Sequence, residues 1–145
     1  MDQSDECEVV ELADGRLYMN ARSRMGKKQR AYCFSSDGGA TWSPIAHHAG
    51  MPERSCQGSV LRVGPNAIVV AHPSDTGSRR VLTVRLSRDD AKTWPVARVA
   101  EVGPAAYSDM AANRDGDVLL VYEGDNYKTI KLARFNLAWL LDGKK

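Results

Sequence analysis

The chain has 145 residues, with 20 basic and 18 acidic side chains and a formal net charge of +2. This length suffices for one domain with a buried core. The near balance of charge gives no strong attraction to nucleic acid or to a membrane surface, so neither is expected as a partner.

The sequence also gives no sign of a membrane span, a secretory signal or a disulfide framework. No apolar run approaches the roughly 18 residues of a membrane span, and the acidic, polar start of the sequence predicts no secretory signal. The compartment is therefore left open. Cys7, Cys33 and Cys56 form no CxxC pair and have no histidine at metal-ligand spacing. We expect all three to be small apolar core residues rather than a disulfide framework.

Short runs with strand character alternate with turn signals along the chain. Alternating polar and apolar residues over 16–22 are typical of a half-buried strand, and Asp115-Gly116 is typical of a hairpin turn. Asn136, followed by helix-forming residues to Leu141, predicts a short helix with an asparagine N-cap. In chain order the expected strands are 7–12, 16–22, 30–35, 43–48, 57–63, 67–72, 80–87, 96–102, 107–113, 117–123 and 128–135.

One loop pattern occurs twice. Ser-Ser-Asp-Gly-Gly-Ala-Thr-Trp at 35–42 is followed by Ser-Arg-Asp-Asp-Ala-Lys-Thr-Trp at 87–94, which sets Trp42 and Trp94 52 residues apart. A period of about 50 residues with four antiparallel strands is typical of a β-propeller blade. The sequence therefore predicts one partial propeller domain over 1–145, with blades at approximately 6–50, 55–103 and 105–136, the last of which has three strands.

The repeated loops are expected to stabilise the fold. Their Ser and Asp side chains can bond backbone N–H groups of the turn, and we expect Trp42 and Trp94 to be largely buried beside the turns. Ala91 stands where the first copy has Gly39, which costs roughly 1 kcal/mol if the backbone there needs a positive φ angle. Calcium or sugar binding by the loop aspartates is disfavoured, because each carboxylate lacks a cluster of further oxygen ligands.

These loops, with Tyr107-Ser108-Asp109 and the carboxylate of Glu123, resemble the C-terminal half of the catalytic domain of a sialidase (neuraminidase) with Asp-box, or BNR, repeats. The resemblance extends from residue 5 to about residue 141. It implies an all-β fold that is part of a six-bladed β-propeller, with about three blades of four-stranded antiparallel sheet, the last incomplete, and a short C-terminal helix. It also implies an exo-α-sialidase, a retaining glycoside hydrolase that releases terminal sialic acid from glycoconjugates, without a cofactor or metal.

The resemblance assigns two arginines to the carboxylate of sialic acid. Arg22 matches the second arginine of the family and Arg79 the third, and the planar fork of arginine suits bidentate binding of a carboxylate. Arg80 is the alternative to Arg79, because alternation along a strand would leave only one of the two on the ligand side. The segment 57–59 also resembles a family segment beside the ligand.

Tyr107 matches the nucleophile of the family, and Glu6 the carboxylate that takes its proton. A neutral phenol avoids the repulsion that an anionic nucleophile would meet beside the carboxylate of sialic acid; sialidases with a tyrosine nucleophile are a known exception to the two-carboxylate scheme of glycosidases. Glu8 and Glu11 are alternatives for the base. Glu123 matches a supporting glutamate that orients the first arginine of the family. The resemblance places that arginine, and the acid/base aspartate, upstream of this sequence.

A second interpretation is a non-catalytic Asp-box propeller module that binds glycans or proteins. The joint presence of Glu6, Arg22, Arg79 and Tyr107 favours the enzyme, because a pure scaffold has no need of all four. Sialylated glycoconjugates are then the expected partners, together with an N-terminal half or a second copy of the chain at the open propeller edges. Without the first arginine and the acid/base aspartate, we expect the chain alone to be weak or inactive.

Overall fold

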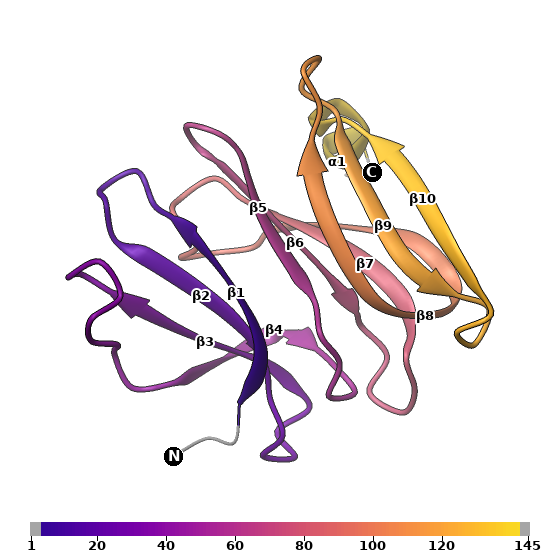
Figure 1. Cartoon of the computed structure of the whole chain (residues 1–145), viewed down its shortest axis with the longest axis horizontal. Coiled ribbons are helices and arrows are strands. Elements are labelled where there is room, and N and C mark those ends of the chain that lie inside the picture. The colour runs from indigo at the N-terminus through magenta and orange to yellow at the C-terminus, as the bar shows by residue number, and fades with distance from the viewer. Residues whose placement is uncertain (1–3, 143–145) are drawn as a thin grey trace.

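A computed structural model describes residues 4–142 as antiparallel β-sheets with one short helix (Figure 1). The first sheet has the order β1-β2-β3-β4, and the second has the order β10-β9-β8-β7-β6-β5. The elements are β1 (Asp5–Glu11), β2 (Leu17–Arg22), β3 (Gln29–Ser35), β4 (Ala46–Pro52), β5 (Ser59–Gly64), β6 (Ala67–Pro73), β7 (Arg80–Ser87), β8 (Val96–Ala112), β9 (Val118–Gly124), β10 (Thr129–Phe135) and α1 (Leu137–Asp142).

Strand β8 is longer than the sequence predicted. Two strands were expected over 96–102 and 107–113, but β8 runs unbroken through Gly103 and Pro104. Its first part pairs with β7 and its second part with β9, with the change of partner at Ala105. The Gly-Pro pair therefore marks a change of pairing partner instead of a turn. Figure 1 shows the result as three neighbouring fans of strands, β1–β4, β5–β8 and β8–β10, which form part of a β-propeller.

Two apolar clusters hold the fans together. The larger one lies within the second sheet, where every residue of β6 is buried and Leu140 of α1 is fully enclosed. The smaller one joins the first sheet to the second through Tyr18 on one side and Val60 and Ile68 on the other. Because burial of each such side chain stabilises by about 1.5–3 kcal/mol, this smaller cluster fixes how the first fan meets the second.

The two Asp-box turns share one hydrogen-bond pattern. In the first, Asp37 accepts from the backbone N–H of Thr41 at 2.8 Å and from its hydroxyl at 2.5 Å, and the Thr41 hydroxyl in particular lowers the pKa of Asp37 to about 2. In the second, Asp89 accepts the same pair of bonds from Thr93. Both aspartates are therefore held within their own turns, as expected for a structural role.

The structure corrects the predicted burial of the two tryptophans and of Cys7, and it gives the φ angle of Ala91. Trp42 and Trp94 are half-buried, not largely buried. Cys7 is exposed on β1, whereas Cys33 and Cys56 are buried. Ala91 does adopt the strained conformation, with a φ angle of 61°.

Candidate active site

The position of Glu6 depends on a β-bulge. The pairing of β1 with β2 shifts between Asp5 and Cys7, so that Glu6 has no partner in the ladder. Its φ angle is 46°, in the left-handed region that costs a residue with a Cβ atom roughly 1–2 kcal/mol. A bulge of this kind redirects one side chain out of the regular alternation. Glu6 is thereby aimed at a neighbour on another sheet.

Tyr107 lies in a second bulge, on β8. Ala105 pairs with Gly124 and Ser108 pairs with Tyr122, so β8 has one residue more than β9 across this interval. The N–H of Tyr107 is taken by a side chain instead, since the Oε2 atom of Glu123 accepts it at 3.2 Å. The two bulges bring residues 101 positions apart in the sequence into contact.

Four of the predicted site residues form one cluster. The hydroxyl of Tyr107 donates a hydrogen bond to Oε1 of Glu6. The Nη1 atom of Arg22 lies 2.5 Å from Oε2 of Glu6 and 3.3 Å from the Tyr107 hydroxyl oxygen. The guanidinium of Arg79 lies over the Tyr107 ring, 5.4 Å from its centroid. Strands β1, β2 and β8 and the loop before β7 thus meet at one place.

The electrostatics of the cluster keep the proton on the phenol. Burial acts to raise the pKa of Glu6, but the hydrogen bonds from Tyr107 and Arg22 outweigh it and lower that pKa below its ordinary value. The hydrogen bond to Glu6 raises the pKa of Tyr107, with burial adding to the effect, although the charges of Arg22 and Arg79 act against it. The site therefore holds a neutral phenol against an ionised carboxylate that can accept its proton.

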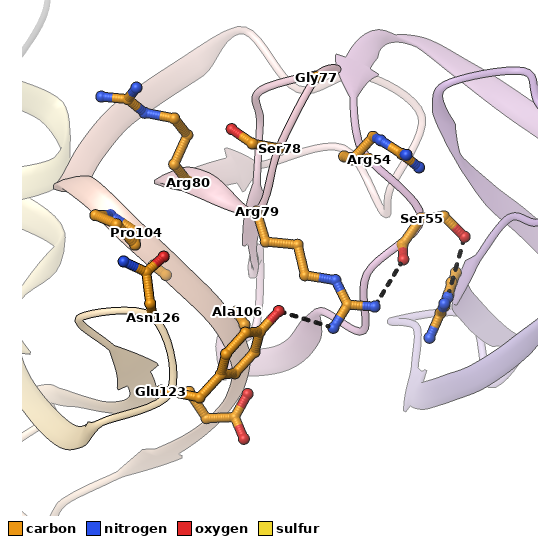
Figure 2. A pocket seen from close by; sticks show the side chains of 13 residues that line it. Arg54, Ser55, Gly77, Ser78, Arg79, Arg80, Pro104, Ala106, Glu123 and Asn126 are labelled. Carbon is orange, nitrogen blue, oxygen red and sulfur yellow. Dashed lines mark hydrogen bonds between the residues drawn. The ribbon is translucent and has the colours of Figure 1, made fainter.

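A pocket of about 620 Å³ opens beside this cluster (Figure 2). Its lining is strongly basic, since it includes Arg22, Arg54, Arg79 and Arg80, and Glu123 is the acidic residue among the lining side chains. A concave surface with several convergent arginines is suited to an anionic ligand. Among residues 4–142, no group of three or more His, Cys, Asp or Glu side chains could hold a metal ion.

Both candidates for the third arginine line the pocket, contrary to the expectation from strand alternation. Arg79 lies just before β7, and the β7–β8 pairing shifts between Arg80 and Leu82, where Val81 has a φ angle of 58°. The regular alternation of side chains therefore does not govern this pair. Only the guanidinium of Arg79 reaches the Tyr107 ring, and in Figure 2 that of Arg80 points to the other side of the pocket.

The alternatives for the base lie elsewhere. Glu8 accepts hydrogen bonds from the N–H of Val60 at 2.8 Å and from Nε2 of Gln57 at 3.0 Å, on the side of β1 that faces β5. Glu11 is exposed at the end of β1. Of the three glutamates, Glu6 alone is bonded to the Tyr107 hydroxyl in the described part of the chain.

Sequence reasoning did not identify two residues that hold the arginines. The hydroxyl of Ser55 accepts from Nε of Arg22 at 3.1 Å, and its carbonyl accepts from Nη2 of Arg79 at 3.3 Å, so that one residue bridges both guanidinium groups. The hydroxyl of Tyr127 accepts from Nη1 of Arg79 at 3.4 Å. A serine in a loop carries no distinctive signal, and Tyr127 ends a run of three residues with positive φ angles that pattern alone does not predict.

Comparison with known proteins shows to which family the chain is similar. Residues 1–120 match the family described as BNR repeat-like domain. A sialidase from Micromonospora viridifaciens is 34% identical, with 94% of this chain and 22% of the relative covered. An exo-alpha-sialidase from Aspergillus fumigatus is 31% identical, with 93% of this chain and 37% of the relative covered.

Similarity of structure extends across the same region. The NanB sialidase from Streptococcus pneumoniae superposes with a TM-score of 0.83 at 19% identity, covering 96% of this chain and 24% of that protein. The chain therefore spans less than two fifths of the length of each of these sialidases. No helix in residues 4–142 is long and apolar enough to cross a membrane. On the family match, the sequence identity and the shared fold, the chain belongs to the sialidase family with BNR repeats and forms part of its β-propeller.

Proposed function

We propose that this chain supplies the nucleophile, its base and two carboxylate-binding arginines of an exo-α-sialidase. The observation that carries the proposal is the contact of the Tyr107 hydroxyl with the ionised Glu6 carboxylate, with Arg22 bonded to both. A phenol is a weak nucleophile unless an adjacent base takes its proton. Glu6 is within hydrogen-bond reach, which is the geometric requirement for that role.

The first step of the reaction forms one bond and breaks another at the anomeric carbon. The Tyr107 oxygen attacks that carbon while its proton passes to Glu6, and the glycosidic oxygen departs with the electron pair of the broken bond. Arg22 and Arg79 hold the sialic acid carboxylate in the basic pocket. Arg22, at 3.3 Å from the phenol oxygen, also stabilises negative charge that develops there during proton transfer.

The second step reverses the first with water as the incoming group. Water attacks the anomeric carbon of the tyrosyl-sialyl intermediate and releases one proton to solvent, where it neutralises the leaving group of the first step. The bond to Tyr107 breaks with its electron pair on the phenol oxygen, which takes back the proton held by Glu6. Two displacements at the same carbon retain its configuration, which is the outcome expected of a retaining glycosidase. Glu6 therefore acts as base in the first step and as acid in the second.

A binding module without catalysis is the second candidate. The observation in its favour is that Glu123, the acidic residue in the pocket lining, is already bonded to the Tyr107 N–H. Within the described residues we assign no acid to the leaving group, and such an acid contributes about 10²–10⁴-fold. The chain alone is therefore expected to bind sialosides and to cleave natural glycans weakly or not at all.

The two candidates differ for substrates whose leaving group needs no acid. We expect the purified chain to release the phenol slowly from an activated aryl sialoside, while sialyl-lactose remains intact. Tyr107→Phe should abolish this release. Tyr122→Phe is the matched control, because it removes another tyrosine hydroxyl bonded to a glutamate, Glu101, outside the site. Equal release by Tyr107→Phe and the unsubstituted chain would contradict the proposed nucleophile, and sialoside binding without any release would favour the binding module.

A further inference from the structure

The side chain of Gln57 is bonded to the backbone of the residue that follows the proposed nucleophile. Its Nε2 atom donates to the carbonyl of Ser108 at 2.9 Å, and its Oε1 atom accepts from the N–H of Ser108 at 2.9 Å. A glutamine amide carries the same donor and acceptor as a peptide group. Gln57 therefore pairs with Ser108 as a residue of a neighbouring strand would.

This pairing occurs where the regular ladder is interrupted. The bulge on β8 sets Ala106 and Tyr107 opposite the single residue Glu123, and pairing resumes with Ser108 opposite Tyr122. Buried backbone groups without hydrogen-bond partners are costly. Glu123 satisfies the N–H of Tyr107, and Gln57 satisfies both polar groups of Ser108. The backbone conformation that directs the phenol is thus fixed from two sides by side chains.

Glu8 fixes the orientation of the Gln57 amide. The Nε2 atom of Gln57 also donates to Oε1 of Glu8 at 3.0 Å, and Oε2 of Glu8 accepts from the N–H of Val60 at 2.8 Å. An ionised carboxylate accepts hydrogen bonds but cannot donate them, so the NH₂ end of the amide must face Glu8. Glu8 lies on β1, two residues after Glu6. The strand that carries the base therefore also anchors the group that holds the nucleophile.

We propose that Gln57, oriented by Glu8, is a positioning residue that holds the Tyr107 phenol at Glu6. The inference rests on the proposed function, because it concerns the same reaction. Within residues 4–142, the hydrogen bonds of the Gln57 side chain go to Glu8 and Ser108 and not to Arg22 or Arg79. Replacement of Gln57 should therefore change the reaction rate more than the binding of the substrate carboxylate. Misplacement of a reacting group by about 1 Å can cost about 100-fold in rate.

The decisive variant is Gln57→Glu, which keeps the size of the side chain. Its second oxygen faces the carbonyl of Ser108 and the carboxylate of Glu8, so repulsion replaces two hydrogen bonds. Ser59→Ala is the matched control. The Ser59 hydroxyl is hydrogen-bonded to the side-chain hydroxyl of Ser108, at 3.2 Å, so this variant removes a contact with Ser108 that does not involve its backbone. Gln57→Met serves as a second variant that removes the polar contacts without adding charge.

Two quantities separate positioning from a merely structural role. The first is the rate at which a 3-fluoro sialosyl fluoride attaches covalently to the chain, since fluoride departs without an acid. The second is the dissociation constant of an unreactive 2,3-didehydro sialic acid. For Gln57→Glu we expect attachment about 10- to 100-fold slower with the dissociation constant changed less than about threefold, and for Ser59→Ala little change in either quantity.

The outcomes distinguish this inference from the proposed function. Attachment to Gln57→Glu at the unsubstituted rate, or equal losses of rate and binding in both Gln57 variants, overturns the positioning role alone. No attachment to the unsubstituted, folded chain overturns both proposals. Hydrogen exchange gives a test without any substitution: the N–H of Ser108 should exchange slowly, and exchange as fast as in an exposed loop would contradict the contact with Gln57.

Discussion

At the scale of single residues, a buried ion pair supports Arg22 and Arg79, the two arginines assigned to the substrate carboxylate. Arg30 donates to Oε2 of Glu53 at 2.8 Å and to the carbonyl of Cys56 at 2.6 Å, and Oε1 of Glu53 accepts the N–H of Ser23 at 2.9 Å. Ser23 follows Arg22, and Cys56 follows the Ser55 that bridges both guanidinium groups. Since the side chains of Arg30 and Glu53 are 0% and 1% exposed, this pair fixes the backbone on both sides of the pocket.

We predict that Glu53→Gln lowers the free energy of unfolding by about 3–5 kcal/mol, because it leaves the buried charge of Arg30 without its counter-ion. Urea denaturation monitored by tryptophan fluorescence measures this change. The control is Arg134→Ala, which removes an ion pair with Asp117 in which the Arg134 side chain is 60% exposed. An exposed pair of this kind contributes about 0–1 kcal/mol. Similar losses for the two variants would mean that the buried pair has no special role.

The acid limb of the pH profile identifies the base. Glu6 must be ionised to accept the phenol proton, and its pKa lies below the ordinary 4.5. The rate of covalent attachment to Tyr107 should therefore fall at low pH with its midpoint below pH 4.5, as Glu6 becomes protonated. Burial raises the pKa of Glu8 above 4.5. Protonation of Glu8 would also release the Gln57 amide, so the profile is compared with that of Glu8→Gln. A limb that stays above pH 4.5 in that variant would contradict the assignment of Glu6.

At the scale of elements, the two Asp-box turns have the same bonds but different surroundings. The Nε1 atom of Trp42 donates to the carbonyl of Gly39 at 3.1 Å, within its own turn. The Trp94 ring packs instead against Tyr18 and His48 of the first sheet, with centroids 5.9 Å and 6.0 Å away. Trp94 thus belongs to the apolar cluster that joins the two sheets.

We therefore predict that Trp94→Ala destabilises the chain by about 3 kcal/mol and Trp42→Ala by about half as much. Thermal denaturation followed by circular dichroism compares the two variants with the unsubstituted protein. The difference arises because loss of Trp94 opens a gap between sheets, whereas loss of Trp42 uncovers a single turn. A larger effect of Trp42→Ala would contradict this description of the contact between the sheets.

Most strand positions could be predicted from the sequence, because alternation, turn residues and the repeat period are local signals. Strand β8 could not, since Gly103-Pro104 is locally a turn signal and only pairing with β7 and β9 keeps it extended. The site residues likewise divide into those with local sequence signals and those placed only by contacts across the fold. Tyr107 and Glu6 carry recognisable motifs, but the bulges that bring them together are visible only once the strands pair. Ser55 acts through contacts across the fold and has no local pattern. The segment 57–59 resembles a family segment, but the contacts of Gln57 with Ser108 and Glu8 appear only in the folded chain.

At the scale of the whole molecule, the six-stranded sheet ends at β10, an edge strand with exposed apolar side chains. Strand β10 is the outermost strand of its sheet, and its Ile130 and Leu132 are 72% and 66% exposed. Exposed apolar side chains on an edge strand favour association with another chain or sheet. An upstream half of the propeller or a second copy of this chain at that edge remains a prediction.

Our central claim is that one short chain, spanning only part of a sialidase, already holds the nucleophile against its base. The most direct measurement is to treat the chain with a 3-fluoro sialosyl fluoride, digest it and locate the added sialosyl mass by tandem mass spectrometry. We predict a single modified residue, Tyr107, and no modification in Glu6→Gln over the same time, because general-base assistance contributes about 10²–10⁴-fold. Modification at another residue, or equal modification of Tyr107 when Glu6 is replaced, would contradict the claim.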